Sequence, residues 1–179
     1  MDQWDEDIAL RMKAGDQAAF KICYQVLSPV LYHLLLKISK NEELAKDLLQ
    51  DTFIDAFQNM KGYKIGSDFK SWIKRIAFNN FYNAVKRKDY INQNDIEVED
   101  CIQDSPIHES ALADTQLFEL LLSILNESER LIIWLYIVEQ YSHQEIATLF
   151  GKTSSFSKST VSRSLMRIKS HVKVKNYAY

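Results

Sequence analysis

The hydrophobic residues of this chain recur at intervals of three and four, which is the period of α-helices packed along one side. From the N-terminus, the pattern predicts a short helix over residues 5–14, ended by Gly15, and a second helix capped by Asp16. The pair Ser28-Pro29 combines a capping residue with a proline suited to the first helical position. It predicts that a further helix starts there.

The next predicted helix, over residues 42–60, has two different faces. Asn41 is a good N-cap for it, and its apolar residues form one stripe for the core. On the other face Asp47, Gln50 and Asp51 stand at i, i+3 and i+4, so they lie side by side on the surface. Taken alone, such a row is either an ordinary solvated face or a docking surface for a basic partner.

Residues 61–88 carry eight basic residues and one acid, with six aromatic residues among them. Positive charge attracts a phosphate backbone, and aromatic rings stack on unpaired bases. The segment reads as a loop followed by a helix, with Ser67 as N-cap and Asp68 at the positive end of the helix dipole. Its aromatic residues fit two interpretations: a bundle helix buried on two sides, or a surface for opened nucleic acid.

An acidic segment divides the chain. Residues 89–114 hold eight acids and no base, and Pro106 interrupts them, which is typical of a flexible linker. We therefore expect an N-terminal domain over 1–88, a linker over 89–113 and a C-terminal domain over 114–179. The predicted fold class is all-α: two small helical domains joined by an acidic linker, the second a helix-turn-helix domain.

The helix-turn-helix is predicted at the end of the chain. A capping box of the form Ser-x-x-Glu starts its first helix at Ser142, and Gly151 ends that helix. A polar turn over 152–158 then leads to a last helix opened by Ser159 or Thr160. The turn and the segment after it carry seven basic residues and no acid, which favours duplex DNA in the major groove over a bland helical hairpin.

Composition argues against several classes of protein. The two cysteines lie far apart without a Cys-x-x-Cys motif, and the four histidines are scattered, so neither a disulfide framework nor a metal site is expected. No apolar run of membrane-spanning length and no signal-peptide pattern occurs, which predicts a cytoplasmic protein without membrane insertion. We find no nucleophile–base pairing or phosphate loop, so catalytic residues, a cofactor and a small-molecule substrate are not expected and the chain is not predicted to be an enzyme.

Four stretches, in this order, resemble the small extracytoplasmic-function sigma factors, the sigma-70 family members of bacterial RNA polymerase. AKDLLQDTFIDAF (45–57) resembles the family's polymerase-docking helix, and FKSWIKRIAFNNFYNAVKRK (69–88) resembles its promoter-opening helix. LNESERLIIWLYIVEQYSHQEIATLFG (125–151) and STVSRSLMRIK (159–169) resemble its C-terminal DNA-binding module. The resemblance implies a sigma factor that binds core RNA polymerase and directs promoter recognition, strand opening and transcription initiation.

The resemblance also implies partners and site residues. The partners are the β′ and β subunits of core polymerase, promoter DNA and an anti-sigma factor, with the acidic linker along the path of nascent RNA. The implied core-polymerase contacts are Asp47, Gln50 and Asp51. The implied contacts with the minus-ten element are Tyr63, Lys64, Lys70, Trp72, Lys74 and Arg75. The implied contacts with the minus-thirty-five element are Thr160, Ser162, Arg163 and Arg167.

Two features depart from the family pattern. The turn between Gly151 and Thr160 is KTSSFSKS, eight residues where about four are usual, which leaves open the residue that starts the recognition helix. Phe78 stands where the family often has a basic or polar residue, and it is either packed or facing DNA.

Two other functions stay open from the residues alone. A stand-alone helix-turn-helix regulator would bind duplex DNA without polymerase, and its N-terminal half would sense a ligand or form a dimer. The aromatic and basic stretch and the Asp47-Gln50-Asp51 face argue against it. A purely helical adaptor protein would carry its basic patches only as surface charge.

Overall fold

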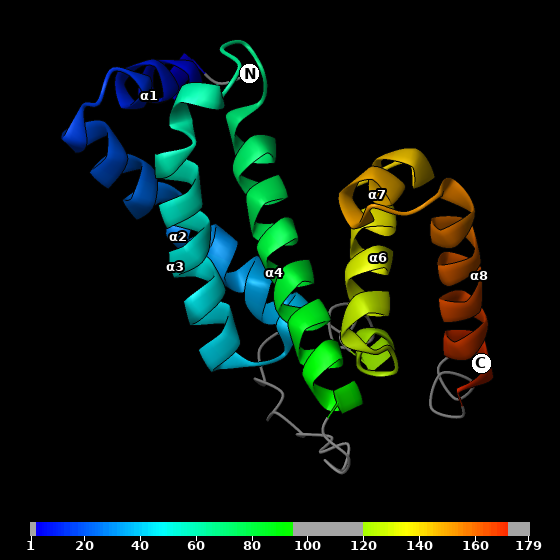
Figure 1. Cartoon of the computed structure of the whole chain (residues 1–179). Coiled ribbons are helices and arrows are strands. Elements are labelled where there is room, and N and C mark those ends of the chain that lie inside the picture. The colour runs from blue at the N-terminus through cyan, green and yellow to red at the C-terminus, as the bar shows by residue number, and fades with distance from the viewer. Residues whose placement is uncertain (1–2, 95–119, 172–179) are drawn as a thin grey trace. The chain divides into compact units, whose positions relative to one another are not determined.

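Every element in the described part of the chain is a helix. The structure is a computed structural model that describes residues 3–94 and 120–171 of the 179. It divides at Ala84/Val85 into two compact units (Figure 1). The helices are α1 (Gln3–Lys13), α2 (Gln17–Ser39), α3 (Glu42–Gln58), the 3-10 helix η1 (Met60–Gly62), α4 (Phe69–Asn94), α6 (Glu127–Ile137), α7 (His143–Phe150) and α8 (Ser154–Ser170). The predicted all-α fold in two domains is confirmed.

The predicted linker begins inside a helix. Residues 89–94 are the last residues of α4, and residues 95–113 lie outside the described residues. The predicted helix before Asn126 is described only from residue 120 onward. The domain boundaries at 88 and 114 stay predictions.

One carboxylate organises the turn between α1 and α2. Gly15 has φ 87°, in the left-handed region that suits glycine, and Asp16 accepts a hydrogen bond from the Ala18 backbone N–H at 2.8 Å. The Nε of Arg11 donates to the same carboxylate at 2.9 Å. The bond from Arg11, followed by the backbone bond, holds the pKa of Asp16 below its ordinary value. The predicted roles of Gly15 and Asp16 are confirmed.

α2 passes through Ser28-Pro29 without a break, so the helix start predicted there is wrong. A proline inside a helix removes one backbone hydrogen bond, and the apolar side of α2 outweighs that loss because it packs against α1 and α3. Without a break, α2 is long and apolar enough to cross a bilayer by length and composition, contrary to the expectation from sequence. Its packing is that of a core helix. Its buried residues are Ala19, Cys23, Leu27, Leu31, Leu34, Leu35, Ile38 and Ser39.

α3 starts where the sequence predicts. The Asn41 side chain accepts a hydrogen bond from the Leu44 backbone N–H at 2.9 Å. The buried stripe of α3 packs against α2 and consists of Ala45, Leu48, Thr52, Phe53 and Ala56. α4 follows the interpretation of a bundle helix buried on two sides, and Phe78 is packed, with no exposed surface.

The N-termini of α6 and α7 in the second unit carry capping boxes, whereas Thr153 at the start of α8 makes no side-chain cap bond. Asn126 and Glu129 form one at the start of α6, and Ser142 and Glu145 form the predicted one at the start of α7. The buried guanidinium of Arg130 donates to the carbonyl oxygens of Leu122 (3.2 Å) and Leu125 (3.1 Å), and burial lowers its pKa. The second core is built from Leu131, Ile132, Ile133, Leu135, Ile146, Ala147, Phe150 and Val161.

Candidate functional site

The outer face of α3 is an exposed polar row with an apolar residue at its end. Asp47, Gln50 and Asp51 are all exposed, as their spacing predicts. Ile54 lies one turn further along the same row and is 43% exposed. Sequence reasoning missed Ile54, although helical spacing places it beside Gln50 and Asp51, four and three residues after them. This row, Asp47 to Ile54, presents negative charge beside one uncovered isoleucine.

Loop 61–68, which includes the last two residues of η1 and leads into α4, is built around Tyr63. The ring of Tyr63 is only 2% exposed and lies 5.3 Å from the Phe69 ring and 5.2 Å from the Trp72 ring, centre to centre. Its hydroxyl donates to the carbonyl of Ser67. In this conformation Tyr63 is a core residue of the loop and does not offer its ring for stacking on a base.

α4 is capped by Asp68, and the prediction of Ser67 as its N-cap is wrong. The Asp68 carboxylate accepts from the backbone N–H groups of Lys70 (3.0 Å) and Ser71 (3.2 Å) and from the Ser71 hydroxyl (2.8 Å). These bonds, led by the one from the Ser71 hydroxyl, lower the pKa of Asp68. The Ser67 hydroxyl donates instead to the carbonyl of Lys64 at 2.6 Å, so it closes the loop rather than the helix.

The other residues expected at the minus-ten element surround this loop and the first turns of α4. Lys64 and Arg75 are exposed, whereas Lys70, Trp72 and Lys74 are half-buried. Trp72 stacks on Phe69 with ring centroids 5.7 Å apart. The structure therefore combines a basic rim with one partly exposed indole, above a buried aromatic cluster of Tyr63 and Phe69.

α8 begins at Ser154, so the long turn and the helix start at Ser159 or Thr160 are both wrong. Gly151, with φ 59°, ends α7, and only residues 152–153 separate it from α8. The serine-rich run reads as a turn by composition, but packing makes it helical. Phe156 lies 6.1 Å from the Phe150 ring, and Ser157 is fully buried beside His143, whose Nδ1 is 3.0 Å from the Ser157 hydroxyl.

This start changes which side chains of α8 face outward. Ser162 and Arg163 are exposed, as predicted. Thr160 is 5% exposed, and its hydroxyl has no hydrogen-bond partner among the described residues. Arg167 is also exposed, as predicted, and it forms an ion pair with Glu129 at 2.5 Å. The outer face of α8 is a single row at helical spacing: Ser155, Lys158, Ser159, Ser162, Arg163 and Met166.

The sequence reasoning missed the first three residues of that row because it placed the helix start too late. Within residues 3–94 and 120–171, no group of three or more His, Cys, Asp or Glu side chains could hold a metal ion. The described residues present three exposed surfaces: an acidic row on α3, a basic and aromatic loop, and a polar and basic row on α8.

Comparison with known families accounts for both units. The family described as Sigma-70 region 2 matches residues 23–91, and the family described as Sigma-70, region 4 matches residues 115–168. This chain is an extracytoplasmic-function sigma factor of the sigma-70 family. As a sigma factor, it is a non-enzymatic subunit that directs promoter recognition by RNA polymerase and the initiation of transcription.

Relatives support the same assignment. The chain is 28% identical over 169 residues to the ECF sigma factor SigE of Mycolicibacterium smegmatis, covering 88% of this chain and 64% of that protein. It is 27% identical over 150 residues to SigM of Bacillus subtilis, covering 82% and 90%. Among solved structures it resembles the sigma factor RpoE of Bartonella quintana, in complex with the anti-sigma factor NepR. That likeness has a TM-score of 0.61 and 27% identity, and covers 87% of this chain and 97% of the other.

Proposed function

We propose that this sigma factor uses three separate faces: the outer face of α3 for core polymerase, loop 61–68 with the start of α4 for the opened minus-ten element, and the outer face of α8 for the duplex minus-thirty-five element. The observation that carries the proposal is the register of exposed residues. Each face is a continuous row of exposed or half-buried side chains on an element whose other side is buried in a core.

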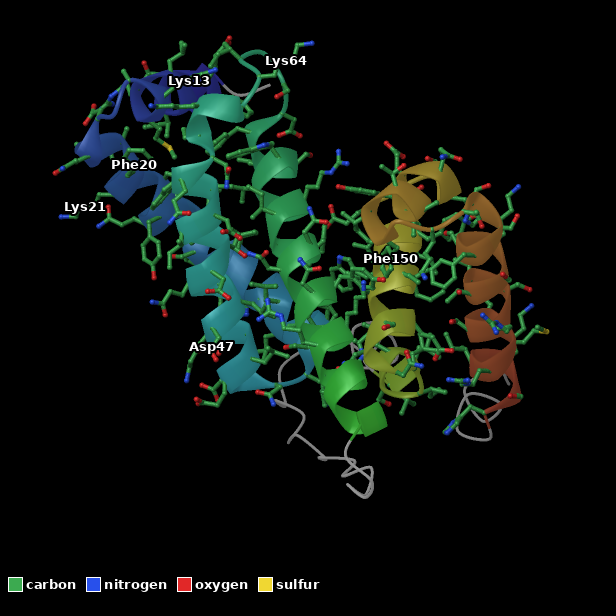
Figure 2. The ribbon with its side chains drawn as sticks, viewed as in Figure 1. Lys13, Phe20, Lys21, Asp47, Lys64 and Phe150 are labelled. Atoms are coloured by element: carbon green, nitrogen blue, oxygen red, sulfur yellow. The ribbon has the colours of Figure 1, made fainter. Side chains whose placement is uncertain are left out.

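The outer face of α3 suits a basic helical partner, and we assign it to the β′ subunit. Asp47, Gln50 and Asp51 supply charge and hydrogen bonding at the rim. Ile54 adds exposed apolar surface that a partner can bury. Figure 2 shows Asp47 near the beginning of α3, whereas Lys64 lies near the opposite end of the first unit. Docking and DNA binding therefore use different ends of one small bundle.

For the minus-ten element, the basic rim attracts the backbone of the strand and Trp72 supplies a ring for an unpaired base. Tyr63 supports Trp72 from below through their ring contact. Its role is therefore to hold the platform, and Lys64, Lys70 and Arg75 are the side chains that meet the strand.

For the minus-thirty-five element, we assign base and phosphate contacts to the outer face of α8, with Ser162 and Arg163 at its centre. Arginine reads guanine in the major groove, and serine hydroxyls serve either a base edge or a phosphate. Thr160 is buried and acts on the packing of α8, whereas Arg167 is exposed at the edge of this face and forms an ion pair with Glu129.

Two further properties belong to this proposal. The chain works in the cytoplasm, where core polymerase is found. An anti-sigma factor regulates it, and the complex of the similar RpoE with NepR supports this part of the proposal.

Run-off transcription with purified core polymerase, on a pool of upstream DNA from the source organism, tests the proposal. The wild type should give discrete new transcripts. Asp51→Arg should abolish core binding and transcription. Glu6→Arg, a similar charge change at an exposed site on α1, should leave both intact. A duplex footprint by the chain alone, without polymerase-dependent transcripts, would instead favour the stand-alone regulator.

Arg163→Ala tests the upstream contact. It should weaken binding at the minus-thirty-five element by about 1–3 kcal/mol if the side chain meets a base edge. Lys21→Ala removes one exposed positive charge from α2 and should not change the upstream footprint. Equal effects of the two variants would show that only net charge matters, and would refute the assignment of α8.

A further inference from the structure

One side chain from α1 reaches loop 61–68 across fifty residues of sequence. The Nζ of Lys13, the last residue of α1, donates to the backbone carbonyl oxygen of Tyr63 at 2.7 Å. A hydrogen bond from a charged donor is stronger than one between neutral groups. Figure 2 shows Lys13 and Lys64 near the same end of the first unit.

With this bond, the ring, the hydroxyl and the carbonyl of Tyr63 are each held by a contact. Its ring is buried against Phe69 and Trp72, and its hydroxyl donates to the carbonyl of Ser67. Lys13 holds the third part of the residue, the carbonyl of the peptide bond that leads into Lys64. The orientation of that peptide bond sets the direction in which Lys64 leaves the backbone.

The rest of the loop closes on the next peptide bond, between Lys64 and Ile65. The carbonyl of Lys64 accepts the hydroxyl of Ser67 at 2.6 Å and its backbone N–H at 3.1 Å. Gly66, with φ 84°, makes the tight return between them. Two sets of hydrogen bonds therefore fix loop 61–68: those from Ser67 to Lys64 within the loop, and the one from Lys13 of α1.

We propose that Lys13 is a positioning residue for the minus-ten element: it holds loop 61–68 in its binding conformation before DNA arrives. This inference rests on the proposed function of the loop. A loop that is already ordered loses less conformational entropy on binding, so the strand binds more tightly to it. α1 thereby contributes to promoter opening without touching DNA.

The test is permanganate reactivity of opened thymines in complexes of holoenzyme with a promoter mapped by wild-type run-off transcription. Lys13→Met keeps most of the apolar length of the side chain and removes its donor and charge. It should lower the equilibrium constant for promoter opening about tenfold, the factor expected from loss of one charge-assisted hydrogen bond. Lys13→Arg retains a charged donor and should restore opening. Lys21→Met, which removes an exposed charge from α2, is the matched control and should open the promoter normally.

Salt dependence separates positioning from direct contact. If Lys13 bound a phosphate, Lys13→Met would reduce the slope of log affinity against log salt by about 0.7 for a single strand. A positioning residue leaves the slope unchanged while affinity falls. A reduced slope, or full opening by Lys13→Met, would overturn the inference, as would an equal loss of core-polymerase binding, because that outcome indicates general damage to the fold. Failure of the wild type itself to open any promoter would refute the proposed function rather than the role of Lys13.

Discussion

Ser164→Ala should stabilise the second unit, although it removes a polar group from a native helix. Ser164 has no exposed surface, and its hydroxyl has no hydrogen-bond partner among the described residues. Burying a hydroxyl without a partner costs about 1–3 kcal/mol by protein mutational data. Alanine removes that cost and leaves the backbone of α8 unchanged.

Two smaller terms of opposite sign accompany this cost, the first adding to the gain in stability and the second reducing it. Alanine also forms helix better than serine, by about 0.5 kcal/mol, and the lost oxygen gives up a few dispersion contacts of about 0.1–0.2 kcal/mol each. Ser162, on the same helix but exposed, provides the matched control, because Ser162→Ala carries the same propensity gain. The difference between the two variants isolates the buried hydroxyl, and we expect it to be about 1 kcal/mol in favour of Ser164→Ala.

Native-state hydrogen exchange of the α6 and α8 amides is the suitable assay, since it measures opening of this unit separately from the first. In DNA binding, the exposed serine should matter more than the buried one: Ser162→Ala should weaken the upstream footprint, and Ser164→Ala should leave it unchanged. Equal stabilisation by both variants would refute the reasoning, because it would assign the whole gain to helix propensity. A loss of stability in Ser164→Ala would show that the hydroxyl is paired in solution.

Three further outcomes are expected. Ile54→Ala should weaken core-polymerase binding about fivefold, since 43% of a side chain worth about 1.5–3 kcal/mol on full burial is still exposed; Leu10→Ala, at 49% exposure on α1, should have no effect in the same titration. Pro29→Ala should stabilise the first unit by about 1 kcal/mol or more in urea unfolding, as it restores a backbone donor to α2, and a loss of stability would mean that the proline ring itself packs. The hydrogen bonds to the Asp68 carboxylate lower its pKa in the folded state, so they stabilise the start of α4 at neutral pH and are lost as the pH falls below about 4. In urea unfolding, Asp68→Asn should therefore lose less stability than the wild type as the pH falls, and an equal loss of stability would contradict the cap.

Local signals in the sequence predict much of this fold. Asp16, Asn41 and Ser142 each cap the helix assigned to them, because a cap depends on the side chain and on backbone groups within three residues of it. The acidic row of α3 is exposed as its helical spacing requires. These features need no knowledge of the rest of the chain.

The errors occur where distant packing decides. Pro29 carries a strong local signal for a helix start, and the buried side of α2 overrides it. Residues 154–158 are polar enough for a turn, and the contacts of Phe156 and Ser157 with α7 make them helical. Tyr63 is an aromatic residue among basic ones, as expected for stacking on a base, yet its ring is buried in the core of its own loop. The bond from Lys13 has no signature in sequence, since its acceptor is a backbone carbonyl fifty residues away.

The early start of α8 has a consequence for the promoters that this chain reads. A start at Ser154 instead of Ser159 adds five residues, which is about 7.5 Å of helix at 1.5 Å per residue. Successive base pairs along B-DNA are about 3.4 Å apart on each strand, so the added length corresponds to about two base-pair steps. Such a helix reads bases with its N-terminal residues, so if α8 has the proposed role, the residues to test for contact with the upstream element include Ser155 and Lys158, which a helix from Ser159 would leave out.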